Sequence, residues 1–339
     1  MTMTAAPSRP TRRRLRLADG AARLRLMALA GIATVLITRG YLAATGYPRI
    51  GGGEIHIGHV VWGGLLMIAA LTVALVWAGG RARVWTALVG GVGIGLFVDE
   101  VGKYLTTTND YFFRPAAAII YLVFAALLVV ASLLGRDTVA EAGEDSERLA
   151  AAAQIAASGL ISGLTPQERE AATRMLAGCP DQDRDAVLRL LAVAPLRAPS
   201  RVAVLLNRIR GWADRVSALR GADAVFFVLL ILSHIVVAIV FIAQAATGEP
   251  HSTDAGAITI SAVTRSAAAI LVVGATVMRL RGRQLTSYRL AKAAILMDLL
   301  ITEAFNFHDS QFSAVAELPH LLVAFAFFSI RQRQVEAQE

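Results

Sequence analysis

The chain has little charge and almost no cysteine. Only 17% of its 339 residues are charged and 56% are hydrophobic, with a mean hydropathy of +0.58. This balance excludes an ordinary soluble domain and makes lipid the expected solvent. The single cysteine, Cys179, excludes an intrachain disulfide framework.

The sequence contains several long apolar segments with few charged residues. A helix that crosses a bilayer needs roughly 20 mostly apolar residues, because hydrocarbon cannot hydrogen-bond an exposed backbone group. The candidate spans are residues 26–46, 56–78, 84–104, 115–135, 224–247, 257–278, 289–307 and 318–330. The last window is short, but we include it because an even number of spans places both termini on the same side of the membrane. We therefore expect an all-α, polytopic membrane bundle of about eight helices.

The basic residues predict how these helices are oriented. Most of the 33 lysines and arginines fall before residue 26, in the turn at Arg81 and Arg83, in residues 136–223, and near Arg281. Basic residues in short loops mark the cytoplasmic side, so both termini are expected in the cytoplasm and the protein in the cell membrane. The same placement attributes the formal charge of +8 to orientation and lipid contact. The expected partners are thus membrane lipids and not nucleic acid.

Composition shifts divide the chain into five parts. These are a basic cytoplasmic tail, a first membrane half, a small helical cytoplasmic domain, a second membrane half and a cytoplasmic tail, over residues 1–25, 26–135, 136–223, 224–330 and 331–339.

Within the small domain, Thr165, Pro166 and Glu168 predict a capped helix start. Residues 181–194 predict a second short helix. Residues 200–220 predict a basic amphipathic helix on the inner leaflet, either a linker or a regulatory element.

The two membrane halves resemble each other at one point. Residues 95–104 align with residues 298–307 without a gap, which places Glu100 over Glu303. With four spans in each half, the halves would be parallel repeats related by an axis along the membrane normal.

The topology gathers ionisable residues at the outer face. Such groups are costly inside a membrane, so they usually face a cavity, a partner or a functional site. Histidine and carboxylate are ligands for zinc and similar divalent ions, and also serve as general acids and bases. We hypothesise a metal centre and a catalytic group set. The expected metal ligands are His56, His59, Asp99 and His320, and the expected catalytic residues are Asp99, Glu100 and Glu303.

Each of these residues also has a purely structural interpretation. His56 and His59 could reach the lipid headgroups, Glu100 could pair with Lys103, and Asp99 could neutralise an arginine in the first span. In the second half, Asp298 lies in mid-helix and is a secondary candidate for a proton or ion path.

The motifs His56-x-x-His59, Asp99-Glu-Val-Gly-Lys103 and Asn109-Asp-Tyr-Phe-Phe113 resemble a group of bacterial multi-pass membrane proteins of unassigned function. The ligand types are similar to those of membrane hydrolases of the alkaline ceramidase and adiponectin-receptor kind. That likeness implies zinc held by histidines and an aspartate among helices.

Three function classes follow from these observations. One-sided clustering of polar groups favours a metal-dependent enzyme on a lipid or lipid-linked substrate. A small-solute or ion transporter would explain the repeat and the mid-span charges. A membrane sensor or scaffold would make residues 136–223 its output domain.

Overall fold

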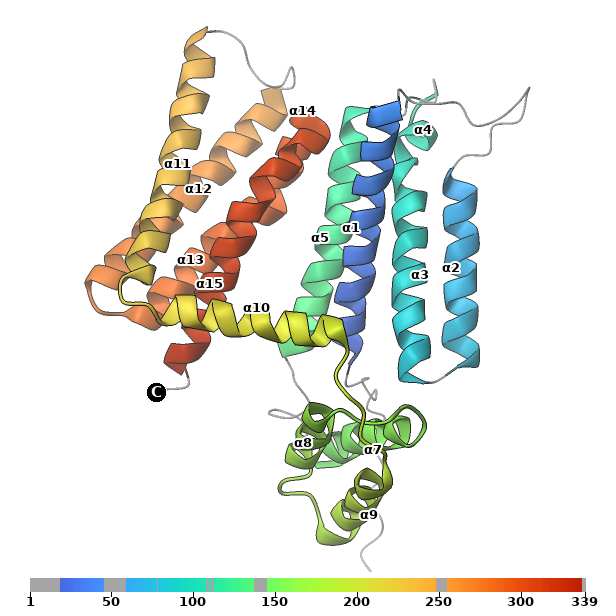
Figure 1. Ribbon diagram of the computed structural model, residues 1–339. Coiled ribbons are helices and arrows are strands. Elements are labelled where there is room, and N and C mark those ends of the chain that lie inside the picture. The colour runs from blue at the N-terminus through green and yellow to red at the C-terminus, as the bar shows by residue number, and fades with distance from the viewer. Residues whose placement is uncertain are drawn as a thin grey trace, which may run out of the picture. The chain divides into compact units, whose positions relative to one another are not determined.

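The computed structural model describes residues 19–45, 59–77, 79–107, 110, 113–136, 145–247 and 255–336. All regular elements in these ranges are helices, and no strand is among them (Figure 1). The all-α prediction is confirmed. The contacts divide the chain into two compact units, one made of Met1–Tyr47, Gly63–Gly95 and Leu127–Ala198, the other of Pro48–Trp62, Leu96–Ala126 and Pro199–Glu339.

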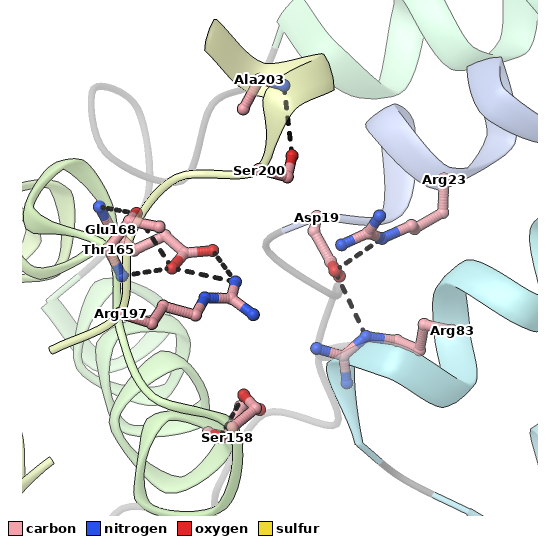
Figure 2. Close-up of polar contacts among 10 residues, drawn as sticks. Asp19, Arg23, Arg83, Ser158, Thr165, Glu168, Arg197, Ser200 and Ala203 are labelled. Atoms are coloured by element: carbon pink, nitrogen blue, oxygen red, sulfur yellow. Dashed lines mark hydrogen bonds and ion pairs between the residues drawn. The ribbon is translucent and has the colours of Figure 1, made fainter. Parts of the chain in front are cut away.

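The N-terminal half contributes four long helices and one short helix. They are α1 (Gly20–Thr45), α2 (His59–Val76), α3 (Gly80–Asp99), α4 (Val101–Leu105) and α5 (Arg114–Arg136). Next to α1, the carboxylate of Asp19 lies 3.0 Å from Arg23 Nε and 3.3 Å from Arg83 Nε at the start of α3 (Figure 2). These ion pairs join the first turns of the two helices.

Glycines let α3 approach its neighbours closely. A Cβ built on Gly91 would lie 2.3 Å from the carbonyl oxygen of Met27, and one on Gly95 would lie 2.7 Å from that of Gly31. Both contacts are with α1, four residues apart, as small-xxx-small packing requires. A Cβ built on Gly93 would lie 2.8 Å from the carbonyl oxygen of Gly63 in α2. Only glycine fits these backbone contacts, so Gly91, Gly93 and Gly95 serve helix packing.

A small domain follows, built from α7 (Asp145–Ser162), α8 (Pro166–Met175) and α9 (Asp181–Val193). Thr165 accepts a hydrogen bond from the Glu168 amide, and the Glu168 side chain accepts one from the Thr165 amide (Figure 2). The predicted capped start at Thr165 and the predicted helix from residue 181 are both confirmed. Alanines and leucines of the three helices and of the segments that join them form the core of this domain, including Ala152, Ala156, Leu164, Leu176 and Leu191.

The C-terminal part begins with α10 (Arg201–Ala218), which the Ser200 hydroxyl caps by accepting from the Ala203 amide at 3.2 Å. It then bends by 93° into the next helix. The remaining elements are α11 (Ala222–Thr247), α12 (Ala255–Leu280), α13 (Gln284–Met297), the π-helical turn η1 (Asp298–Thr302), α14 (Glu303–Ser310), the 3₁₀ segment η2 (Gln311–Glu317) and α15 (Leu318–Glu336).

Aromatic and small residues form the core of the α11–α15 bundle. Tyr288 and Phe328 are completely enclosed, and Phe227 packs edge-on against Phe328 with ring centroids 5.0 Å apart. Alanines of α12 and α13 let these helices pack closely around the rings. The first half of α5 also packs on this part of the chain, where the Tyr121 ring stacks on Phe307 at 4.6 Å.

Six helices of the described residues are long and apolar enough to cross a membrane, or seven if the bent pair α10–α11 counts as one span. The predicted number of eight is not confirmed. The window 289–307 is divided among α13, η1 and α14, and α13 alone has 14 residues. The parallel repeat likewise stays a prediction.

Candidate functional site

A cavity of about 300 Å³ lies within the bundle formed by α11, α12, η1, α14 and α15. Its volume is at the lower end of the range for small-molecule sites. Six ionisable residues line it: His234, Arg265, Asp298, Glu303, Glu317 and His320. The lining thus contains three carboxyl groups and a single arginine, so acidic groups are in excess. Charge of this sign favours cations and protons.

The helix geometry changes where the cavity begins. The α-helical hydrogen bonds of α13 give way at Asp298 to a π-turn that ends at Thr302. Such turns add one residue to a helical turn and are frequent at functional sites. Within this turn, the Thr302 hydroxyl donates to Asp298 Oδ1 at 3.2 Å.

A histidine of α11 binds the same aspartate. His234 Nε2 lies 3.1 Å from Asp298 Oδ2, and His234 Nδ1 lies 2.9 Å from the carbonyl oxygen of Leu230. A carbonyl oxygen only accepts hydrogen bonds, so Nδ1 carries a hydrogen. Nε2 has no hydrogen-bond partner among the described residues, so its 3.1 Å approach to the Asp298 carboxylate is attractive only when the imidazole or the carboxyl group carries a second proton. The His234–Asp298 pair is thus a place where a proton can be taken up beside the cavity.

Glu303 occupies the next turn. It is 2% exposed, and one of its oxygens accepts from Asn306 Nδ2 at 3.1 Å. Its other oxygen, Oε2, is buried and has no hydrogen-bond partner among the described residues. An unsatisfied buried carboxylate oxygen is unfavourable by about 1–3 kcal/mol or more, so it calls for a proton or a ligand.

Asn306 connects this glutamate to the rest of the lining. Its amide nitrogen also donates to Glu317 Oε2 at 3.0 Å, and its amide oxygen accepts from Arg265 Nη2 at 2.6 Å. Arg265 therefore reaches the two glutamates through a neutral amide. This arrangement holds the arginine near the acidic groups without closing the cavity.

An apolar layer separates the cavity from the charged end of the bundle. Along α11 the order is Asp223, Phe227, Leu230 and then His234. On α12, Val272 and Ala275 lie between the cavity-lining Arg265 and the ion-paired Arg279. On α15, Phe327 and Phe328 lie between the cavity-lining His320 and the ion-paired Arg331. At that end, Arg331 Nη2 lies 2.8 Å and Arg279 Nη1 3.5 Å from Asp223 Oδ2. The polar path is interrupted by packed side chains in the middle.

The end of α3 carries a second buried acidic group. Glu100 is 1% exposed and accepts from the Val60 amide at 2.9 Å and from Lys103 Nζ at 2.7 Å. His59 Nδ1 lies 3.6 Å from Glu100 Oε1. The carboxylate thus receives the first free amides of α2, where a negative charge is favourable. The predicted pairing of Glu100 with Lys103 is confirmed.

The ionisation of Glu100 follows from these contacts, because the residue directly follows the span Gly80–Asp99. Burial favours the neutral acid, but the hydrogen bonds from Lys103 and Val60, together with the lysine charge, hold the pKa of Glu100 below its ordinary value of 4.5. Glu100 is therefore an ionised carboxylate at neutral pH and serves as a helix cap and ion-pair partner.

The predicted site residues are only partly brought together. Glu303 and His320 line one cavity, and His59 lies beside Glu100. Asp99 is buried, and His56 lies outside the described residues. Within the ranges that the structure describes, no three His, Cys, Asp or Glu side chains are grouped as metal ligands would be. The proposed metal quartet therefore stays a prediction.

Sequence reasoning identified Asp298 as a mid-helix residue but did not join it to the outer glutamates. The missing signal was spacing along α13–α14, because Asp298, Thr302, Glu303 and Asn306 recur at helical intervals.

A scan against protein-family models and searches of curated proteins and of solved structures found no match to this chain.

Proposed function

We propose that the protein is a proton-coupled membrane transport protein that binds a small cationic solute in the cavity of the α11–α15 bundle. The observation that carries the proposal is Glu303, a buried carboxyl group with an oxygen that lacks a partner in the described residues and that lines an acidic cavity. Ionisable groups within membrane helices commonly belong to substrate and proton pathways.

Proton coupling is supported by the His234–Asp298 pair. The 3.1 Å approach of His234 to Asp298 lets the pair take up a proton beside the cavity, and the charge of the pair changes when that proton leaves. A cation and a proton compete for the same acidic groups, so binding of one releases the other. The expected result is exchange of a solute cation for a proton.

The apolar layer supports transport through alternating access. A permanent pore needs a continuous polar path, whereas a carrier exposes its site to one side at a time. Here Leu230 and Phe328 belong to the packed layer between the cavity and the Asp223 ion pairs. The distribution of basic residues supports an orientation in which the cavity faces the outside and both termini lie in the cytoplasm.

Proton movement in proteoliposomes tests this proposal. Vesicles loaded with a pH-sensitive dye would receive external guanidinium or choline, which stay cationic at all working pH values and cannot cross as neutral bases. We expect wild-type protein to alkalinise the vesicle interior as the cation enters and protons leave. Glu303→Gln removes the negative charge at nearly constant shape and should abolish this response.

Two controls separate the cavity from general effects. Glu170→Gln changes an exposed glutamate of α8 and should behave as wild type. Ala269→Leu fills part of the cavity without altering its charge and should weaken the response. Folded wild-type protein that moves no protons with either cation, or a Glu303→Gln variant that is fully active, would contradict the proposal.

A metal-dependent enzyme acting on a lipid is the second candidate, and the contact of His59 with Glu100 at 3.6 Å is the observation that favours it. It requires His56, Asp99 and His320 to complete the predicted ligand set with His59. Metal analysis of purified protein tests it: near-stoichiometric zinc that is lost in His59→Ala and Asp99→Ala would support the enzyme, and metal-free folded protein would exclude it.

A further inference from the structure

The helix α10 has an apolar stripe that is not covered by the bundle. Leu205, Ile209 and Trp212 are spaced by four and three residues, so they share one face of the helix. All three are exposed, Trp212 to 66%. Leu219, seven residues after Trp212 and just past the end of the helix, is exposed as well.

The opposite side of α10 is attached to the bundle. Ser217 is buried, and its hydroxyl accepts from Gln334 Nε2 of α15 at 3.0 Å. Beyond the bend, Asp223 binds Arg331 of the same helix. These contacts hold α10 at 93° to α11, across the end of the bundle (Figure 1). Since α11 is a long apolar helix, an element at a right angle to it runs parallel to the membrane plane.

Arginines border the apolar stripe. Arg208 and Arg215 each follow a stripe residue by three positions, and both are exposed. Arg210 and the acidic Asp214 lie on the other side of the helix, since they are five and nine residues after Leu205. Arginine side chains beside an apolar face extend their charge to the headgroup level while their stems cover hydrocarbon.

We propose that α10 is a membrane-surface helix that binds anionic phospholipid headgroups through Arg208 and Arg215, while Leu205, Ile209 and Trp212 enter the acyl boundary. Charge complementarity identifies the lipid: two exposed arginines lie along one edge of the stripe, and the only acidic residue of the helix lies on the far side. This proposal does not depend on the function of the cavity.

Trp212 supplies a native probe for the experiment. The full-length protein would be placed in nanodiscs in which either phosphatidylcholine or phosphatidylglycerol carries brominated acyl chains, which quench tryptophan at short range. The signal of Trp212 is the difference between wild type and Trp212→Phe, because the other three tryptophans are common to both. We expect stronger quenching by brominated phosphatidylglycerol than by brominated phosphatidylcholine.

Charge variants identify the groups responsible. The preference for phosphatidylglycerol should fall about five-fold for each arginine lost in Arg208→Gln and Arg215→Gln, the equivalent of roughly 1 kcal/mol per basic group at an anionic surface. Arg210→Gln is the matched control and should retain most of the preference. Elution volume in gel filtration and circular dichroism confirm that each variant is folded.

Three results would overturn the proposal. Equal quenching by the two lipids would remove the anionic preference, and absence of quenching would show that the stripe does not meet lipid. Equal losses in Arg210→Gln and Arg208→Gln would show that net charge acts, and not the border of the stripe.

Discussion

Glu100 and Glu303 are two buried glutamates at interruptions of membrane helices, and their surroundings assign them different roles. Glu100 lies between α3 and α4 and receives hydrogen bonds from the Val60 amide and from Lys103. Glu303 follows a π-turn and lines a cavity with one oxygen lacking a partner in the described residues. The comparison teaches that burial of a carboxyl group does not identify a functional site. Unsatisfied hydrogen-bonding capacity beside open volume is the more informative property.

Helix packing is close in the first membrane half and leaves open volume in the C-terminal bundle. Gly91 and Gly95 bring α3 into backbone contact with α1, which leaves no room for a solute there. In the C-terminal bundle, a cavity of about 300 Å³ lies next to a layer of large aromatic side chains. Small residues close the first region, and polar residues around a π-turn keep the second one open.

The largest expected effect separates the two glutamates by function. Glu303→Gln should reduce cation-driven proton movement at least tenfold, because it removes the charge that the cation and the proton share. Glu100→Gln should leave the transport rate per folded molecule within about twofold. The measurement is initial dye response in proteoliposomes, normalised to reconstituted protein; equal losses in both variants would remove the distinction.

A second effect concerns the proton held at His234. In Asp298→Asn, the side-chain amide can donate to His234 Nε2, so the pair is satisfied without the additional proton. We expect a folded protein whose cation binding no longer releases a proton. Calorimetric titration with guanidinium in buffers of different ionisation enthalpy counts the released protons, and an unchanged proton count in Asp298→Asn would contradict the assignment.

The two glutamates should rank in the opposite order when the stability of the protein is measured instead of transport. Glu100→Ala leaves the amide of Val60 and the ammonium of Lys103 without their acceptor, and we expect a loss of about 2–3 kcal/mol, since hydrogen bonds to charged groups contribute roughly that much. Glu303→Ala should be neutral or stabilising, because its carboxyl group is unsatisfied. Thermal unfolding in one detergent, monitored by circular dichroism, compares the two variants.

Acid should weaken the protein through Glu100. Its pKa is lowered in the folded state, because the hydrogen bonds from Lys103 and Val60 outweigh the effect of burial. The stabilisation is therefore complete above the ordinary pKa of 4.5 and is lost as the pH falls through the lower folded value. Wild type should lose more thermal stability than Glu100→Gln between pH 6 and about pH 3; parallel curves for the two proteins would show that other groups cause the acid sensitivity.

The smallest expected effect tests the closed packing of the first region. Gly91→Ala places a methyl group against the Met27 carbonyl and should destabilise the protein by about 1–3 kcal/mol. Gly64→Ala is the matched control, because no atom lies within 4 Å of an added Cβ there. A similar melting temperature for both variants would indicate that α1 and α3 separate easily.

Much of the fold was predictable from local patterns. Apolar length predicted membrane helices, the Thr165-Pro166-Glu168 triplet predicted the start of α8, and the amphipathic period predicted α10. The number of spans was less accessible, because residues 289–307 contain several charged side chains and are interrupted by η1. A π-turn leaves no clear signal in hydropathy.

The candidate site was predictable in its residue types but not in its grouping. The sequence marked Glu303 and Asp298 as costly groups in a membrane helix. It could not indicate that His234 meets Asp298 or that Asn306 connects Arg265 to Glu303, since these contacts join segments far apart along the chain. It also treated Glu100 and Glu303 as equivalents, although their partners differ.

By itself, the sequence determined that this protein is helical, apolar enough for a membrane, and supplied with a small capped helical domain, because these properties depend on composition and on contacts between residues near in the chain. Only the tertiary structure decided which ionisable groups share a cavity and which are satisfied. Those outcomes depend on how the helices pack around one another, and a helix presents its side chains to neighbours that its own residues do not specify.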